Sequence, residues 1–233
     1  MKFVITDECT EYKGMRLYRL RAVREMFSIL DGAIKPGELG GWIESEKNLS
    51  QNGLCWIHSE AKVYGNAHLC EDARITDEAV ACGNAIISGE ALVAGCARIS
   101  GNALVTGLAK IDGRQVSVGE HAWIGEYAQV RGSSSIMGEA RVGGCASVSQ
   151  MAVVTGRSQI TGHAKISGAA RIQNKAMIAD QAEVRGHAVV RGRAKLCDSA
   201  VVEGEMIIEG AVTIAGNTIL SGCERMAGCA RIG

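Results

Sequence analysis

Five histidines supply the residue type that most often carries acid–base chemistry near neutral pH. They are His58, His68, His121, His163 and His187. A histidine serves as a general base when a carboxylate orients its ring. Glu205 follows His187 by 18 residues, a spacing that recurs elsewhere in the chain. His163 has the same spacing from Cys145, a pair that could act as base and nucleophile. His187, Glu205 and His163 are therefore the candidate catalytic residues, and they meet their partners only in a fold that repeats at this spacing.

A six-residue repeat runs through most of the chain. From residue 61 a small residue, usually alanine, is followed two positions later by an aliphatic residue and four positions later by glycine, as in AIISGEALVAGCARISG at 85–101. The alternation places the small and aliphatic side chains on one face of a short extended segment. Glycine, or an Asn or Asp that tolerates positive φ, turns the corner. Three such segments close a triangular coil, and one extra residue near Arg114 and Gln115 predicts a bulged corner.

This repeat predicts an all-β fold, a single-stranded left-handed parallel β-helix of about ten coils over residues 42–233. Residues 1–41 are expected to form an N-terminal cap and lead-in. Within them, segments 3–6 and 15–22 alternate like a β-hairpin that covers the backbone edge of the first coil. The last coil has no such cover, and we expect a partner chain to cover its edge.

Residues that lie three repeats apart stack on one another in such a coil, so the outer surface can be predicted as ladders of side chains. The basic run at 183–196 resembles a nucleic-acid surface when taken alone. Its charges nevertheless face opposite charges one coil away, in the pairs Lys165 with Glu183, Arg185 with Glu203 and Arg191 with Glu209. We therefore do not expect nucleic-acid binding. Equal numbers of basic and acidic residues, 25 each, also argue against an acidic mimic of DNA.

Apolar side chains at outward positions indicate an interface, because a solvated solenoid surface does not need them. One set comprises Val80, Ile86, Leu92 and Leu104, and a second comprises Val189, Val201, Ile207 and Ile219. β-Branched residues also favour strands for reasons unrelated to contact, which leaves the valines open to either interpretation. We expect the two sets to mediate assembly into a homo-oligomer.

Composition excludes several other classes of protein. The N-terminal segment lacks the apolar run of a signal peptide, and no window is apolar over the thickness of a bilayer, so we expect a cytoplasmic protein without a membrane segment. The nine cysteines include no CxxC pair, which favours free thiols over disulfides or zinc. His58 and His68 do not fall in one column of adjacent coils, so we expect no metal site.

The hexads at 42–233 resemble those of the hexapeptide-repeat superfamily, left-handed β-helix proteins that include many acyl- and acetyltransferases. They differ in one respect, because glycine here stands two positions after the aliphatic residue instead of directly after it. The opening GGWIESEKNLSQNGLCWIHSEAKVYGNA at 40–67 resembles the YdcK-like proteins of bacteria and their phages, a group that carries an acetyltransferase label. The resemblance implies a histidine general base near a subunit boundary and an acetyl-CoA donor.

Interruptions of only one or two residues leave no loop long enough to enclose a substrate. The sequence therefore favours a non-catalytic structural or protein-interaction solenoid that needs no cofactor, forms a homo-oligomer and binds a bacterial host or phage protein. The alternative is an acyltransferase that binds acetyl-CoA at a subunit interface and uses His187, Glu205 or His163.

Overall fold

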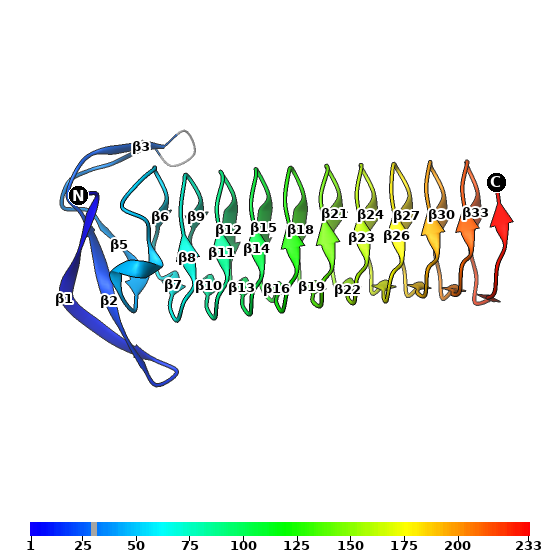
Figure 1. The fold of residues 1–233 in the computed structure, drawn as a ribbon, viewed down its shortest axis with the longest axis horizontal. Coiled ribbons are helices and arrows are strands. Elements are labelled where there is room, and N and C mark those ends of the chain that lie inside the picture. The colour runs from blue at the N-terminus through cyan, green and yellow to red at the C-terminus, as the bar shows by residue number, and fades with distance from the viewer. Residues whose placement is uncertain (29–31) are drawn as a thin grey trace.

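The computed structural model describes residues 1–28 and 32–233, and it shows an N-terminal hairpin followed by a long parallel β-solenoid (Figure 1). Strands account for almost all of the regular structure, and the described part of the chain contains one 3-10 turn, η1 (Glu46–Asn48). The predicted all-β solenoid is therefore confirmed. It has about 11 turns, close to the number expected from the repeat.

Each turn contributes one short strand to each of three parallel faces, and strands one turn apart pair with one another. Face A consists of β5 (Leu39–Ile43), β7 (Lys62–Val63), β10 (Val80–Ala81), β13 (Arg98–Ile99), β16 (Ser117–Val118), β19 (Ser135–Ile136), β22 (Val153–Val154), β25 (Arg171–Ile172), β28 (Val189–Val190), β31 (Ile207–Ile208) and β34 (Arg225–Met226). Face B consists of β8 (His68–Leu69), β11 (Ile86–Ile87), β14 (Leu104–Val105), β17 (Trp123–Ile124), β20 (Arg141–Val142), β23 (Gln159–Ile160), β26 (Met177–Ile178), β29 (Lys195–Leu196), β32 (Thr213–Ile214) and β35 (Arg231–Ile232). Face C consists of β6 (Trp56–Ile57), β9 (Arg74–Ile75), β12 (Leu92–Gly95), β15 (Lys110–Gly113), β18 (Gln129–Arg131), β21 (Ser147–Val148), β24 (Lys165–Ile166), β27 (Glu183–Val184), β30 (Val201–Val202) and β33 (Ile219–Leu220).

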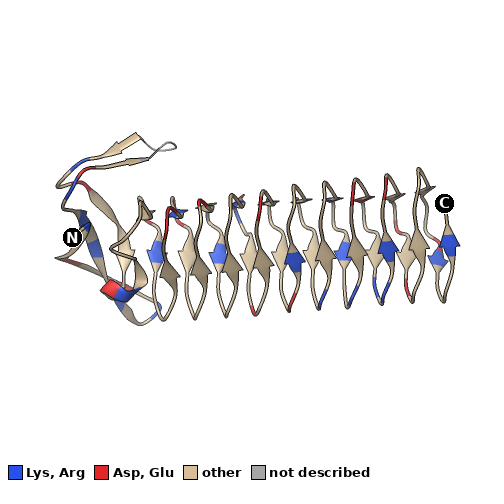
Figure 2. Cartoon of the chain, turned by 45° about the horizontal axis from the view of Figure 1, so that its top comes forward, with Lys and Arg blue, Asp and Glu red and all other residues tan. Residues whose placement is uncertain are grey.

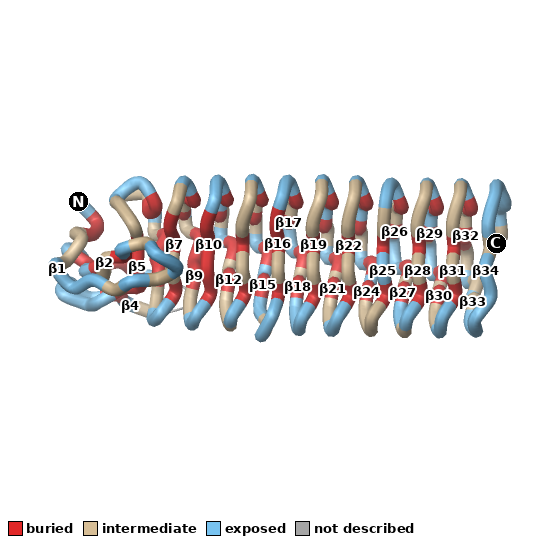
Figure 3. Tube along the Cα trace, turned by 90° about the horizontal axis from the view of Figure 1, so that it is seen from below, coloured by how far each residue is buried: buried red, intermediate tan, exposed pale blue. Residues whose placement is uncertain are grey.

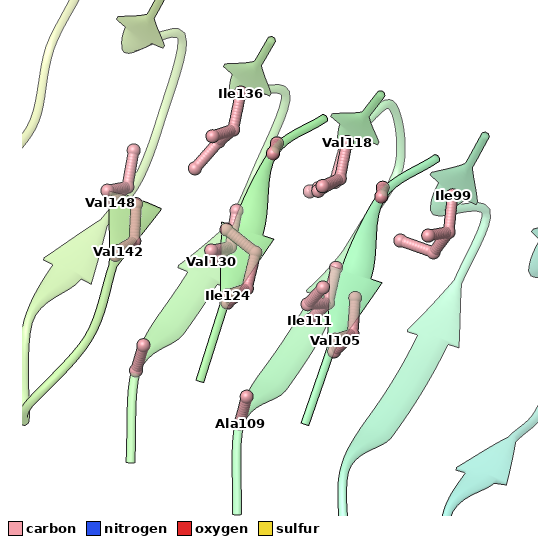
Figure 4. Packing of buried hydrophobic residues seen from close by; sticks show 14 of the residues in the cluster. Ile99, Val105, Ala109, Ile111, Val118, Ile124, Val130, Ile136, Val142 and Val148 are labelled. Carbon is pink, nitrogen blue, oxygen red and sulfur yellow. The ribbon is translucent and has the colours of Figure 1, made fainter. Parts of the chain in front are cut away.

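The two inward columns predicted by the repeat fill the interior. The aliphatic column is buried from Val63 to Ile214, and the alanines beside it are equally buried. Figure 4 shows Ile99, Val105 and Ile111, one from each face, pointing into the space between the faces. Large side chains at both inward positions would not fit this narrow space, which explains the alternation with alanine. Exposed residues gather at the corners and in the last turn (Figure 3).

Backbone conformation at the corners explains why glycine recurs there. Eight non-glycine residues of the glycine column have φ between 56° and 64°, and they are Glu71, Asp77, Glu120, Glu126, Gln150, Asn174, Asp180 and Asp198. The structure reveals a second role for such side chains that spacing did not indicate. The Glu71 carboxylate accepts a hydrogen bond from the amide of Gly89 at 2.6 Å, one turn away. Asp77 accepts one from the amide of Gly95 at 2.8 Å, so these two acidic corners are each bonded to the next turn.

One turn is a residue longer than its neighbours. The step from Arg98 to its partner Ser117 is one residue longer than the step from Ser117 to its partner Ser135. The extra residue lies between β15 and β16, at the corner formed by Arg114 and Gln115. The predicted bulge is confirmed, and pairing resumes without a break on either side of it.

The N-terminal hairpin is part of the solenoid's own sheet. β1 (Phe3–Tyr12) and β2 (Met15–Ala22) pair antiparallel, and β2 also pairs antiparallel with β5. Because β5 pairs parallel with β7, the two hairpin strands and the face A strands form one 13-stranded sheet. The hairpin lies where the sequence predicted it, but its first strand is longer than the segment at 3–6.

A second, smaller hairpin was not predicted. β3 (Met26–Ser28) pairs antiparallel with β4 (Gly32–Ile34), and we call these two strands the arm. Figure 1 shows the arm reaching over the first turns of the solenoid. Met26 is buried in the core cluster, whereas Phe27 is 69% exposed and therefore available to a ligand.

Candidate functional site

His187 and Glu205 occupy equivalent corner positions in successive turns, as the repeat predicts, and both are exposed. Among the residues that the structure describes, no hydrogen bond or ion pair joins their side chains. His187 donates its backbone amide to the carbonyl of Gly204 at 2.7 Å, a ladder bond available to any non-proline residue there. The carboxylate therefore does not orient the imidazole within one protomer, and a catalytic role for this pair stays a prediction.

His163 lines an open hollow of about 350 Å³ together with Lys165, Gln181 and Glu183. The Glu183 carboxylate already accepts a hydrogen bond from Nζ of Lys165 at 2.9 Å. Cys145 lies exposed one turn earlier, on the corner position equivalent to that of His163. No bond between the imidazole and either neighbour occurs in the described part of the chain, so His163 also stays a prediction.

The charged ladders form as predicted and account for part of the basic run. Lys165 contacts Glu183 at 2.9 Å, Arg185 contacts Glu203 at 2.6 Å, and Arg191 contacts Glu209 at 2.5 Å. Arg225 also contacts Glu209, and the hydrogen bonds from Arg225 and then Arg191 lower the pKa of the Glu209 carboxyl. Basic and acidic residues both occur along the length of the solenoid (Figure 2). Arg185 and Arg191 of the run at 183–196 are therefore ion-paired, as expected from the stacking rule, whereas Arg193 and Lys195 form no ion pair with the described residues.

The first predicted apolar set is divided among the three faces. Val80 is only 8% exposed, because it packs with Leu17 of β2 in a cluster beneath the hairpin. Ile86 and Leu104 stack on face B, while Leu92 lies on face C. Only Ile86 and Leu104 thus form a shared outward surface.

The second predicted set forms two separate pairs. Val189 stacks with Ile207 on face A, and Val201 stacks with Ile219 on face C. Arg225 follows Ile207 directly along face A and interrupts the apolar surface there. Ile219 is 65% exposed and lies in the last face C strand. These residues stay interface predictions, but they do not form one patch.

A continuous apolar ladder forms on face B, and it includes a residue that the sequence did not single out. Leu104 pairs with Ile86 on one side and with Trp123 on the other. We call Ile86, Leu104 and Trp123 the face B ledge. The indole lies close to the backbone, since a Cβ added at Gly143 would fall 2.8 Å from the Trp123 ring. The signal in the sequence was a tryptophan at an outward position.

An open hollow of about 430 Å³ adjoins the face B ledge. Its lining comprises Leu104, His121, Trp123, Glu139 and Arg141. The Nε2 atom of His121 lies 3.4 Å from the side-chain amide nitrogen of Asn102. An imidazole, an indole and a guanidinium are therefore gathered here, away from the two histidines that the sequence nominated.

A third hollow follows the corner between faces B and C. It has a volume of about 520 Å³, and its lining includes Glu71, Asp72, Glu90, Leu108, Glu126 and Tyr127. An adjoining hollow of about 190 Å³ shares Asp72, Glu90 and Leu108 with it and extends to Phe27 on the arm. We call the two hollows together the corner groove.

Asp180, Cys197 and Asp198 place their ligand atoms within 4.8 Å of one another, as a metal site would require. The Asp180 carboxylate accepts a hydrogen bond from the amide of Asp198 at 3.1 Å, and Asp198 accepts one from the amide of Gly216 at 2.8 Å. These are the bonds that acidic corners make elsewhere in the solenoid. Desolvation raises the pKa of the Cys197 thiol, which disfavours the thiolate that binds metals. Corner structure therefore explains the cluster without an ion.

The fold defines the chain as a parallel β-solenoid whose candidate sites are open surfaces: the face B ledge with its hollow, and the corner groove. The chain matches no known protein family and no curated protein. Across residues 1–28 and 32–233, no helix is long and apolar enough to cross a membrane.

Proposed function

We propose that the chain is a non-catalytic structural solenoid that acts by binding proteins through its exposed faces, beginning with a second copy of itself. The observation that carries this proposal is the face B ledge, where Ile86, Leu104 and Trp123 stack without interruption. Ile86 is 44% exposed, and Leu104 and Trp123 beside it are half-buried. Adjacent apolar side chains that all retain contact with solvent are typical of an interaction surface. Tryptophan is also among the residues most enriched at positions that dominate binding energy.

The ledge is self-complementary about its centre. A two-fold contact on Leu104 puts Ile86 of each copy opposite Trp123 of the other, so that both ends of the ladder are covered at once. Closed two-fold assembly also limits growth to a dimer. The ledge therefore supports an isologous dimer in preference to an open filament.

The regular backbone supports a binding role over catalysis. Strands of one face keep a nearly constant spacing, as the partners Trp42 with Lys62 and Ser117 with Ser135 illustrate, so no long loop is inserted in the described turns from β7 to β35. Among the described residues of the arm, which precedes these turns, only Phe27 borders a hollow. A catalytic site needs donors and acceptors fixed around the reacting atoms in a largely dry cavity. In the described residues, His163 and His187 have no bonded carboxylate to fix them.

Self-association is tested by sedimentation velocity on the wild type, Trp123→Ala and Met151→Ala. Met151 is a matched control, because it is 62% exposed but lies at a corner outside face B. We expect a dimer for the wild type and the control, and a monomer for Trp123→Ala. A monomeric wild type at micromolar concentration, or equal effects of the two substitutions, contradicts the proposal.

The wider setting follows from the resemblance to YdcK-like proteins of the hexapeptide-repeat superfamily. We place the protein in the cytoplasm of a bacterium, with a host or phage protein as its further partner. The partner class is tested by cross-linking in cells and mass spectrometry of the products, with Trp123→Ala as the control for contacts that require the dimer.

One observation favours the alternative, an acyltransferase that binds acetyl-CoA between subunits. His121 lies beside the face B ledge, so a dimer through this ledge brings a histidine to the subunit boundary, with Trp123 and Arg141 nearby to contact a nucleotide and its phosphates. Millimolar acetyl-CoA then raises the melting temperature of the wild type, and less so that of Arg141→Ala. An unchanged melting temperature excludes this alternative.

A further inference from the structure

The corner groove is built by glycines that stack between acidic residues. Along the corner, Glu71, Gly89, Gly107 and Glu126 follow one another at one residue per turn. Gly89 and Gly107 have φ of 68° and 69°, and a Cβ added at Gly89 would lie 2.6 Å from the backbone nitrogen of Gly107. No side chain can therefore fill the middle of the groove, and the hollow is a fixed feature of the corner.

The ionisable groups of the larger hollow carry one sign of charge. Glu71, Asp72, Glu90 and Glu126 line it, and no lysine, arginine or histidine is among the described residues that do. Three of the four carboxylates are held by backbone amides: Glu71 by Gly89, Asp72 by Leu54, and Glu126 by Gly144. Fixed carboxylates around a hollow attract a cation without having to be ordered by it.

Glu90 differs from the other three carboxylates. Like Asp72 it lines both hollows of the corner groove, but within the described residues its side chain makes no hydrogen bond or ion pair. The smaller hollow also contains two basic side chains, Arg74 and Lys110, so a cationic ligand is favoured only on the side of Glu90 that faces the larger hollow. Glu90 is therefore the carboxylate best able to meet a charge supplied by a ligand.

Apolar side chains flank the carboxylates on both sides. Tyr127 is 60% exposed, Phe27 is 69% exposed and Leu108 is 38% exposed, and all three border the corner groove. Their exposure is costly unless a ligand covers them. An aromatic ring beside carboxylates also suits an organic cation with an alkyl stem, because the stem packs on the ring while the charge meets the acid.

The span of the groove limits what it can hold. It covers four successive turns, from Glu71 to Glu126, and strands one turn apart are separated by about 4.8 Å. The length along the axis is thus about 14 Å, which matches about four residues of extended chain. A folded domain would contact only its rim.

We propose that the corner groove binds an extended segment of a partner protein that presents a lysine or arginine to Glu90 and packs an apolar neighbour against Leu108 and Tyr127. This site goes beyond self-association through the face B ledge, and it lies on a different part of the solenoid. Phe27 of the arm contacts one side of the bound partner segment, because it lines the smaller hollow of the corner groove.

The probe is a short fluorescein-labelled peptide of alternating leucine and lysine, measured by fluorescence anisotropy against the intact protein. A matched peptide of alternating leucine and glutamate is the ligand control. We expect the lysine peptide to bind and Glu90→Lys to weaken it at least about tenfold, because reversal replaces an attraction with a repulsion. Tyr127→Ala weakens it less, and Glu78→Lys, an exposed corner charge outside the groove, leaves it unchanged.

Equal binding of the two peptides, or equal effects of Glu90→Lys and Glu78→Lys, overturns the proposal. So does loss of the peptide signal in the presence of spermine at concentrations equal to the peptide, since the site then takes a small polyamine instead. Sedimentation of Glu90→Lys is expected to match the wild type. The proposal for the corner groove and the proposal for the dimer can therefore be disproved independently of each other.

Discussion

The Nζ atom of Lys2 lies 2.9 Å from Sγ of Cys55, and both side chains are completely buried where the hairpin meets the first turn. Nζ also donates hydrogen bonds to the carbonyl oxygens of Cys55 at 2.9 Å and Asn52 at 3.3 Å. Burial lowers the pKa of Lys2 and raises the pKa of Cys55. The low polarity around this contact thus favours the uncharged amine and thiol, and the contact joins the start of the chain to the solenoid.

Replacing Lys2 by methionine is expected to destabilise the protein by about 1–3 kcal/mol at neutral pH, because the carbonyl of Cys55 loses its donor while remaining buried. Urea unfolding measures the change, with Lys175→Met at an exposed corner as the control. A Lys2→Met variant as stable as the control contradicts the role of this contact.

The same variant has a predictable pH dependence. The folded-state pKa of Lys2 is depressed, so the unfolded chain binds more protons between that pKa and the ordinary lysine pKa of 10.5. The contribution of Lys2 to stability is therefore fully present above 10.5 and is lost as pH falls through the folded pKa. The stability difference between wild type and Lys2→Met should grow as pH rises above neutrality, and a constant difference rules out the shift.

Glu60 couples the hairpin to the solenoid and should do so only above its folded pKa. Its carboxylate accepts hydrogen bonds from Arg19 at 2.8 Å and from the Trp42 indole at 2.9 Å, and these bonds lower its pKa. The stability they provide is present above the ordinary glutamate pKa of 4.5 and is lost as pH falls through the folded pKa. Glu60→Gln should cost about 0.5–1 kcal/mol at pH ~7, because the side chain is largely exposed. The cost should vanish in acid, as measured by urea unfolding at both pH values.

Substitutions of Asp77 can distinguish the two contributions of a corner residue, its backbone strain at positive φ and its hydrogen bond to the next turn. Asp77 has φ of 59° and its carboxylate accepts the Gly95 amide at 2.8 Å. Asp77→Ala loses the hydrogen bond but keeps the backbone strain, whereas Asp77→Gly loses the bond and relieves about 1 kcal/mol of strain. We expect the alanine variant to be less stable than the glycine variant by about that amount in thermal unfolding. The reverse order contradicts this account of the corner.

The narrow interior predicts that alanine at its inward positions cannot be enlarged. Ala146 is completely buried, so Ala146→Leu should destabilise the solenoid by about 1–3 kcal/mol or more. Ala211 lies exposed at a corner, and Ala211→Leu should change the free energy of unfolding little. Chemical denaturation of both variants provides the comparison, and equal losses would point to a wider interior than the packing indicates.

The repeat predicted what depends on spacing alone. The stacked pair Lys165 and Glu183 and the bulge beside Arg114 follow from counting residues, because the turns share one backbone path. Trp123 was missed for a physical reason: the extra residue lies between it and Leu104, so the two stack one position further apart than three whole repeats. Val80 was misplaced on the surface because the hairpin that covers it is not periodic.

The corner groove could not have been predicted either. It depends on the arm, whose strands carry no repeat, and on how Glu71 and Glu126 bend toward amides one turn away. The sequence also could not predict whether His187 and Glu205 contact each other. Their equivalent corner positions fix the stacking of the two residues but not the direction of their side chains.

Backbone bonds between successive turns run along the axis, from the Trp42 amide to the Ala61 carbonyl at one end to the Ala215 amide and the Ile232 carbonyl at the other. A pulling force between the two ends of the rod therefore loads the turns in series, and the outermost turn detaches before the next one is strained. Each detached turn releases about 60 Å of chain. Under tension the molecule should therefore lengthen in equal steps, one step for each turn that detaches.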